Sequence, residues 1–292
     1  GVCDDNMSKE EYRKKKIREI CNKILWKRTH LCGELGPELD GKEVVLYGWV
    51  HRVRRMGGLN FLLLRDRSGI VQVIFSKKVL PKDTLSIIKE VSLESALAIR
   101  GRVKANDEAP NGFEIVPIDV MLVNKSEKPL PLDVTETIPA EMDTRFDNRP
   151  IDLRKRRVTS IFIIESIVSN ALREYFYKNG FVEIHTPKIV AGATEGGANV
   201  FKVQYFKNEV YLAQSPQLYK QLALVGGLDR VFEIAPAYRA EEHNTPRHLN
   251  EYISVDAEIA WIKDEEGPMK VLENAVSYAV EKVREEAERE LE

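Results

Sequence analysis

Five strand-like runs between residues 43 and 123 constrain the fold of this chain more than any other feature of the sequence. β-Branched and aromatic residues dominate the runs, which read EVVLYGWVHRV, LNFLLLRD, GIVQVIFS, LESALAIRGRV and GFEIVPIDVMLV. Glycine-containing turns separate them, and a short amphipathic helix that begins at Pro81 is predicted between the third and fourth runs. Three strands, a helix and two more strands is the order of a five-stranded OB barrel, a fold that often binds oligonucleotides. A small barrel that binds no ligand is the alternative.

The length of 292 residues suggests two domains. We expect a basic N-terminal arm at 1–28, the barrel at 29–125, a proline-broken hinge at 126–158 and a second domain at 159–292. Within the arm, residues 8–28 carry nine Lys or Arg against three Glu, with apolar residues at helical spacing. Such a helix could follow a phosphate backbone, or it could be a solubilising arm.

Composition narrows the cellular setting. We expect no membrane span, because no apolar run approaches ~18 residues, and no secretory signal, because no apolar stretch follows the charged start. The cysteines Cys3, Cys21 and Cys32 form no C-x-x-C pair and are odd in number, which favours a reducing, cytoplasmic location. The net charge of −2 argues neither for nor against a nucleic-acid partner.

The second domain mixes helices with short strands. We predict a helix at 158–180, strands within 181–190, 199–206, 209–214, 229–241 and 249–261, a helix at 215–227, and a long final helix that runs to the last residue. The predicted fold class is therefore α+β, with an OB barrel followed by an antiparallel sheet and flanking helices.

Three polar segments of the second domain carry candidate chemistry. The densest is YRAEEHNTPRHLNE at 238–251, whose arginines suit a polyphosphate ligand because guanidinium binds phosphate through paired donors. The segment ATEGGA at 193–198 is a glycine-permitted loop with one carboxylate, Glu195. Gln217 and Lys220 lie three residues apart on one helix face and could clamp a small carboxylate. Taken singly, each segment is an ordinary hairpin, turn or exposed helix face.

Together these segments resemble the class II aminoacyl-tRNA synthetases. FVEIHTPKIV, with Pro187, looks like motif 1, and RVFEIAPAYRAEEHNTPRHLNEYISVDAEIAW looks like motif 2. The set of ATEGGA, LAQSPQLYKQ and RAEEHNTPRHLNE is similar to the aspartyl-tRNA synthetases of archaeal and eukaryotic type. GWV, FLLLRDRSGIVQVI and PLPLD agree with that family's anticodon-binding OB domain and hinge. Asparaginyl-tRNA synthetases share motif 2, but the QSPQLYK segment favours aspartate as the amino-acid substrate.

The resemblance implies an aspartate–tRNA ligase that uses ATP and Mg²⁺. Arg239 would be the catalytic residue, which binds the α-phosphate of ATP and the attacking aspartate carboxylate and stabilises the pentacoordinate phosphorus. Other residues would divide between the substrates: Glu241, His248 and Leu249 for ATP; Gln217, Lys220 and Glu195 for aspartate; Asn244 and Thr245 for the acceptor end of tRNA. Lys220 would reject asparagine, because the amide would bring donors to a fixed cation.

For the barrel, the resemblance implies an anticodon site. Phe61 would stack on an anticodon base, and Arg65 and Gln72 would bond base edges. His51 and Pro110 would lie near the third anticodon base. Strict relatives resemble one another in carrying tryptophan at the position of His51, so we hypothesise relaxed specificity for tRNA(Asp) and tRNA(Asn). The helix with motif 1 implies a homodimer.

The resemblance covers motifs 1 and 2 and stops before motif 3. Family catalytic domains continue into a strand with metal-binding carboxylates and a glycine-rich motif 3, whereas the last glycine here is Gly267. We therefore expect a fragment of a longer enzyme rather than a truncated paralogue, with a partial class II sheet, and we name no metal ligand. Two alternatives stay open: a non-catalytic tRNA-binding paralogue, and a synthetase-derived asparagine synthetase, against which the retained OB domain counts.

Overall fold

The chain consists of two compact units, Gly1–Thr159 and Ser160–Glu292. The computed structural model describes residues 8, 10–11, 26–56, 58–77, 80, 82–192, 199–243, 245 and 247–291. Most of the predicted basic helix at 8–28 lies outside the described residues.

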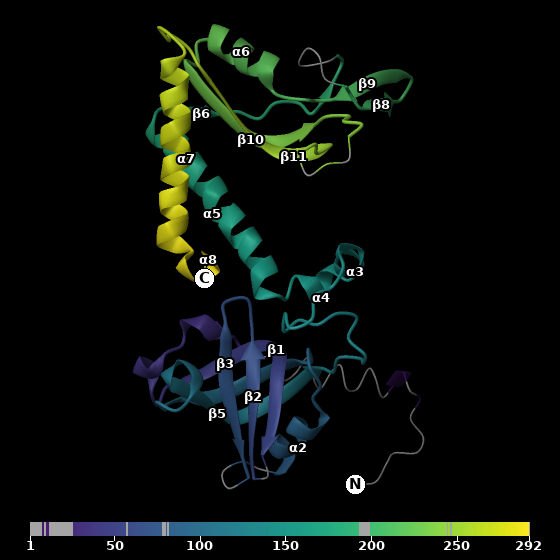
Figure 1. Ribbon diagram of the computed structural model, residues 1–292, viewed down its shortest axis with the longest axis vertical. Helices are drawn as coiled ribbons and strands as arrows, with labels where there is room; N and C mark the ends of the chain where they lie inside the picture. The colour runs from purple at the N-terminus through teal and green to yellow at the C-terminus, as the bar shows by residue number, and fades with distance from the viewer. Residues whose placement is uncertain are drawn as a thin grey trace. The chain divides into compact units, whose positions relative to one another are not determined.

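The first unit contains the predicted five-stranded barrel (Figure 1). Its strands are β1 (Glu43–Met56), β2 (Leu59–Arg65), β3 (Ile70–Ser76), β4 (Ala96–Ala105) and β5 (Phe113–Asn124), closed in the order β1-β2-β3-β5-β4. Helix α2 (Lys82–Glu90) lies between β3 and β4 in the sequence, as predicted. The described part of the unit also contains the short 3₁₀ helices η1 (Cys32–Glu34), η2 (Pro37–Leu39) and η3 (Pro110–Gly112).

Alternation along the strands separates the barrel core from its outer face. In β2, Leu62 and Leu64 are fully buried, while Phe61 and Leu63 point outward and are half-buried. Gly48 in β1 allows the strands to approach closely, because a Cβ there would lie 2.5 Å from the backbone oxygen of Arg65.

The segment that we predicted to be an extended hinge is partly helical. Helices α3 (Met142–Asp147) and α4 (Arg149–Asp152) form around the carboxylate of Asp152, which is fully buried. Arg145, Arg149 and Lys155 all contact this carboxylate, at 2.9 to 3.1 Å. These ion pairs join residues that have no helical periodicity in the sequence, so the pattern alone did not show the two helices.

The second unit is a layered arrangement of a central sheet and helices. One sheet has the order β11-β10-β6 and the other β7-β9-β8. The strands are β6 (Val182–Glu183), β7 (Ile189–Val190), β8 (Lys202–Tyr205), β9 (Asn208–Leu212), β10 (Arg230–Tyr238) and β11 (Glu251–Ile259). The β10–β11 pair is antiparallel, as predicted, but β6 pairs with β10 in parallel. The Ala213 N–H donates to the Lys188 carbonyl and the Tyr238 N–H donates to the Ala213 carbonyl, so the two sheets meet at Ala213.

Helices cover both faces of β10 and β11 (Figure 1). Helix α5 (Arg156–Lys178) begins in the last residues of the first unit. It packs on one face of the sheet together with helix α7 (Glu266–Glu286). Phe176 of α5 and Ala275 of α7 form a buried cluster with Phe232 of β10. Helix α6 (Gln217–Val225) packs on the other face through Lys220. The predicted final helix is interrupted, because α7 ends at Glu286 and Ala287, which has non-helical φ and ψ, separates it from the short α8 (Glu288–Leu291).

Candidate functional site

The barrel gathers four predicted nucleic-acid contacts on the outer face of β1, β2 and β3. Phe61 and Arg65 alternate with buried residues along β2, and Gln72 of β3 pairs with Leu63 across the strands. His51 lies at the bulge of β1 between Val50 and Arg52. The exposed Arg54 is directly opposite Phe61, so positive charge flanks the aromatic ring.

Arg65 lies between the two residues that we connected with tRNA specificity. On one side, its Nη1 is 3.0 Å from Nδ1 of His51. On the other side, Arg65 pairs with Ile70, whose carbonyl accepts a hydrogen bond from the Asn111 side chain, next to the exposed Pro110. His51 and Pro110 thus lie at the same end of the barrel. Arg65 itself is only 6% exposed, because its guanidinium also donates to Glu94 at 2.8 Å.

In the second unit, one face of the β10–β11 pair carries the polar groups. Arg239 follows β10, and its backbone N–H donates to the carbonyl of Asn250, which extends the antiparallel ladder. Its guanidinium lies 5.9 Å from the ring centre of Tyr252. Because side chains alternate across a strand, Tyr252, Ser254 and Asp256 share this face. Opposite them, Ala235 and Ala237 form a floor of small side chains.

Lys220 reaches the same face from α6. Its Nζ lies 3.4 Å from Oδ1 of Asp256, 3.2 Å from Oε2 of Glu258 and 3.3 Å from the carbonyl oxygen of Ala257. The lysine is 6% exposed, so these acceptors fix the position of a buried cation. Gln217 is on the same helix one turn earlier and is exposed, with its backbone N–H donating to Oγ of Ser215. Lys220 therefore contacts the polar face, while Gln217 lies exposed one turn away on the same helix.

The hairpin between β10 and β11 holds the other predicted nucleotide contacts. The Glu241 backbone N–H donates to the Asn250 side chain at 3.0 Å. Nδ1 of His248 lies 2.7 Å from Oγ1 of Thr245, and the rings of His248 and His243 are 5.3 Å apart. Leu249 is exposed. Two predicted residues, Asn244 and Glu195, lie outside the described residues.

Glu233 belongs to this face and escaped the sequence analysis. It is directly opposite Asp256 and 2% exposed. Its carboxylate accepts from the backbone N–H and the hydroxyl of Thr186 at 2.7 and 2.8 Å, and from Nζ of Lys188 at 3.0 Å. This carboxylate thereby ties the segment around Pro187 to β10. The sequence pattern could have predicted this polar face, because Tyr252, Ser254, Asp256 and Glu258 alternate with apolar residues along β11. It could not have predicted the partners of Glu233, because these lie more than forty residues earlier in the chain.

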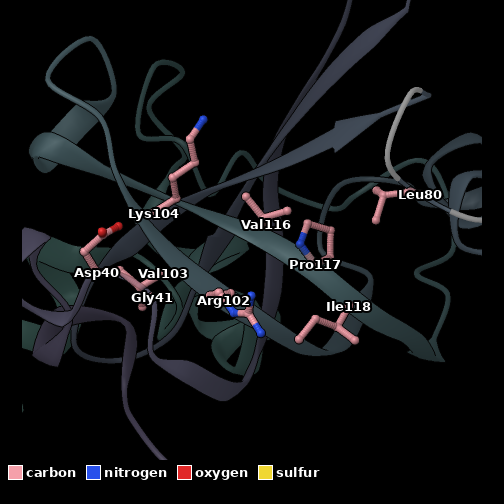
Figure 2. Close-up of a pocket in the computed structure, with 9 residues that line it drawn as sticks. All are labelled: Asp40, Gly41, Leu80, Arg102, Val103, Lys104, Val116, Pro117 and Ile118. Atoms are coloured by element: carbon pink, nitrogen blue, oxygen red, sulfur yellow. The ribbon is translucent and has the colours of Figure 1, made fainter.

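Two cavities are lined mainly by other residues, although Glu258 also lines the second of them. One, of about 470 Å³, is on the barrel and is lined by basic side chains of β4, Arg102 and Lys104, and by apolar side chains that include Ile118 of β5 (Figure 2). The other, of about 360 Å³, lies between α5, β11 and α7 and is lined mostly by apolar residues such as Phe176, Val255 and Leu272. No predicted site residue lines either cavity.

Neither a metal cluster nor a membrane helix is found in the part of the chain that the structure describes. Its His, Cys, Asp and Glu side chains form no group of three or more that could hold a metal ion. Its helices include none that is both long and apolar enough to cross a bilayer.

Comparison with known proteins identifies the family. Residues 141–292 match the class II tRNA synthetases (D, K and N), and residues 44–123 match the OB-fold nucleic acid binding domain. The chain belongs to the class II tRNA synthetases. The polar face of β10 and β11 and the outer face of the barrel therefore lie in the two matched parts of a synthetase.

The relatives of this synthetase carry aspartate in their names. The chain is 48% identical over 273 residues to an aspartate–tRNA(Asp/Asn) ligase of Methanocaldococcus jannaschii. This match covers 94% of this chain and 62% of the relative. It is 52% identical over 264 residues to an aspartate–tRNA(Asp) ligase of Pyrococcus furiosus. This second match covers 90% of this chain and 60% of the relative. The chain thus spans about three fifths of the length of these curated relatives.

A solved structure supports the fold of both units. The asparaginyl-tRNA synthetase from Pyrococcus horikoshii complexed with asparaginyl-adenylate matches with a TM-score of 0.84 and 36% sequence identity. The match covers 91% of this chain and 60% of that chain. The predicted fold class, an OB barrel followed by a class II synthetase sheet, is confirmed.

Proposed function

We propose that this synthetase is an aspartate–tRNA ligase, which forms aspartyl-adenylate from aspartate and ATP and transfers the aspartyl group to the 3′ end of tRNA(Asp). The observation that carries the proposal is the shared face on which Arg239 and Lys220 lie. Tyr252, beneath the Arg239 guanidinium, and Asp256, which holds Lys220, are four residues apart on one strand, roughly 13 Å at 3.3 Å per residue. We infer that the face between them receives a small molecule with a phosphate at one end and a carboxylate at the other, because a cation lies near each end of this span.

Each cation has a separate task. Arg239 binds the α-phosphate and the attacking carboxylate, and its charge, which does not titrate, stabilises the phosphorus centre as negative charge develops. Lys220 binds the side-chain carboxylate of aspartate, with Gln217 and Glu195 completing that subsite. Asp256 and Glu258 keep the ammonium in place, so an asparagine amide would turn its own donors toward a cation that cannot move away. Glu241, His248 and Leu249 hold the nucleotide, and Asn244 and Thr245 meet the acceptor end of tRNA.

Aspartate-dependent pyrophosphate exchange tests the proposal. The intact protein exchanges pyrophosphate into ATP only when aspartate is present, and Arg239→Ala lowers the rate by about 10²-fold or more. Lys220→Met raises the KM for aspartate more than the KM for ATP. The matched control is Lys207→Met, an exposed lysine of the β8–β9 turn, which leaves both values unchanged.

Three results would contradict this proposal, the first for Arg239 alone and the other two for the ligase as a whole. Exchange that survives in Arg239→Ala contradicts the role of that residue. Formation of asparagine from ammonia in the absence of tRNA identifies a synthetase-derived asparagine synthetase, and a complete lack of exchange with retained tRNA binding identifies a non-catalytic paralogue.

We further propose that the outer face of the barrel binds the anticodon and accepts both tRNA(Asp) and tRNA(Asn). Phe61 stacks on a base, Arg65 and Gln72 read base edges, and His51 and Pro110 lie near the third anticodon base. One curated relative carries both tRNAs in its name and another carries only tRNA(Asp), so the family contains both specificities. Charging assays with the two purified tRNAs decide between them, and a failure to aspartylate tRNA(Asn) contradicts relaxed specificity.

Class II aminoacyl-tRNA synthetases use ATP and a divalent metal. We propose ATP and Mg²⁺ for this protein, in the cytoplasm, where tRNA is charged. Among the described residues, no three or more His, Cys, Asp or Glu side chains form a group that could hold the ion.

A homodimer through α5 and the motif 1 segment is also proposed. Ile161 and Phe162 are 60% and 46% exposed on α5, and a second copy would remove this apolar surface from water. Sedimentation velocity tests the dimer. Ile161→Asp shifts the protein toward the monomer, whereas Glu165→Asp on the same helix does not; an unchanged sedimentation coefficient for Ile161→Asp contradicts the interface.

A further inference from the structure

A buried carboxylate in the barrel lies behind the residues proposed to read the anticodon. Glu94 is in the turn between α2 and β4 and is 3% exposed. Its backbone N–H donates to the carbonyl of Val50, and the N–H of Val50 donates to the carbonyl of Ser95. The turn is therefore fixed to β1 at the residue immediately before His51.

The backbone of Glu94 suggests that its side chain has a task. Its φ is +64°, in the left-handed region that glycine or asparagine normally occupies and that is unfavourable for other residues. In addition, Oε1 is buried and has no hydrogen-bond partner among the described residues, which also costs free energy. A residue that is unfavourable in two ways points to a role that stability does not explain.

The other carboxylate oxygen holds two arginines. Oε2 accepts from Nη2 of Arg65 at 2.8 Å and from Nη1 of Arg154 at 3.0 Å. The guanidinium of Arg154 also lies 4.6 Å from the ring centre of Trp49, which pairs with Arg65 across the strands. Without the carboxylate, two like charges would lie close together in a buried place, so Glu94 is what keeps Arg65 where it is.

Arg65 in turn fixes the chemical form of His51. A guanidinium can only donate, so Nδ1 of His51, 3.0 Å from Nη1, must accept. An imidazole that accepts through Nδ1 is neutral and carries its proton on Nε2. Burial of the ring and the positive charge of Arg65 both lower the pKa of His51, which agrees with the neutral form.

We propose that Glu94 is a positioning residue for anticodon reading, which acts through Arg65 to hold His51 as a neutral ring with Nε2–H as its only donor. This inference rests on the proposed function of the barrel. The anticodons of tRNA(Asp) and tRNA(Asn) end in cytosine and uracil, and the acceptor that these bases share at the same ring position is O2. A single N–H donor aimed at that oxygen accepts both bases, which gives relaxed specificity a chemical basis.

The wild-type protein offers a test that needs no variant. Long-range ¹H–¹⁵N spectra of protein labelled at histidine report which ring nitrogen of His51 carries the proton, with His51→Gln used to assign its signals. We expect protonated Nε2 and unprotonated Nδ1 at pH 7. A proton on Nδ1, or on both nitrogens, overturns the proposal.

Charging kinetics test the role of Glu94. Glu94→Gln removes the charge that holds Arg65, so the KM for tRNA(Asp) and for tRNA(Asn) rises about tenfold, the equivalent of one lost hydrogen bond. The kcat and the aspartate-dependent pyrophosphate exchange stay unchanged, which a general loss of structure would not allow. Arg154→Met leaves the Glu94–Arg65 pair intact and is expected to change either KM less than threefold, within about 0.7 kcal/mol. The matched control is Glu43→Gln, a barrel carboxylate that faces Arg100 and contacts neither Arg65 nor His51.

Isosteres of His51 complete the experiment. Glutamine places an N–H near the position of Nε2 and asparagine near that of Nδ1, so His51→Gln keeps the charging of tRNA(Asn) and His51→Asn loses it. The proposal is overturned if Glu94→Gln leaves both KM values unchanged, or if His51→Asn charges tRNA(Asn) better than His51→Gln does. Pyrophosphate exchange continues in both cases, so the proposed ligase function would still stand. If the wild-type protein shows no aspartate-dependent pyrophosphate exchange, the proposed ligase function itself is rejected.

Discussion

Asp152 is a single residue on which the local structure of the chain depends. Its carboxylate is fully buried between Arg145, Arg149 and Lys155, which are themselves partly exposed except for the lysine. Burial alone would raise the pKa of the Asp152 carboxyl, but hydrogen bonds from Arg145 and Lys155 and their charges outweigh burial and lower it below 3.8. The carboxylate is therefore ionised at neutral pH and organises α3 and α4.

We expect Asp152→Asn to lower the free energy of unfolding by about 2–3 kcal/mol at pH 7, because three cations lose their counter-ion. The folded pKa is below the unfolded value of 3.8, so the contribution is fully present above pH 3.8 and is lost as the pH falls further. Urea unfolding from pH 8 to pH 3 measures it. Asp143→Asn, an exposed acid of α3, is the control and should stay within about 0.5 kcal/mol. A difference between wild type and Asp152→Asn that does not shrink at low pH would contradict this account.

The strand β1 is the element that both closes the barrel and presents His51. Its first half pairs with β4 and its second half with β2, with a bulge between Val50 and Arg52. The bulge changes which side chains face outward, so Val53 turns toward Leu62 while Arg52 and Arg54 join the outer face. The strand can lie this close to β2 because residue 48 is glycine.

Gly48→Ala is expected to destabilise the barrel by about 2–3 kcal/mol, since the added carbon would lie 2.5 Å from the Arg65 carbonyl oxygen and 3.0 Å from Cγ of Leu64. Gly58→Ala is the control, because nothing lies within 4 Å of a Cβ at that position. Thermal unfolding of the two variants provides the measurement. Equal midpoints for both alanine variants would show that the strands move apart at little cost.

At the scale of the whole molecule, the two units have separate cores. Phe75 belongs to the barrel core with Leu46 and Ile115, whereas Phe232 packs with Phe176 at a ring separation of 4.8 Å. Phe75 and Phe232 are both fully buried. Each unit therefore has its own apolar driving force for folding.

We expect Phe75→Ala and Phe232→Ala each to cost about 3–5 kcal/mol, each in one unit only. Calorimetry follows both transitions. Fluorescence of a Trp261→Phe background reports on the first unit alone, because Trp26 and Trp49 lie in it. If Phe232→Ala lowers the midpoint seen by Trp26 and Trp49 as much as Phe75→Ala does, the units unfold together and the expectation is wrong.

The sequence by itself determined the barrel, the order of its strands, the helix α2 and the α+β class, because strand alternation and turn residues are local signals. It also determined the family, through Pro187 and the arginine-rich hairpin around Arg239. Only the tertiary structure decided that Lys220 lies between Asp256 and Glu258, that Asp152 turns a predicted hinge into helices, and that Glu94 supports Arg65 and His51. The reason is physical: a buried charge is defined by partners from distant parts of the chain, and no spacing in the sequence records which of them will meet.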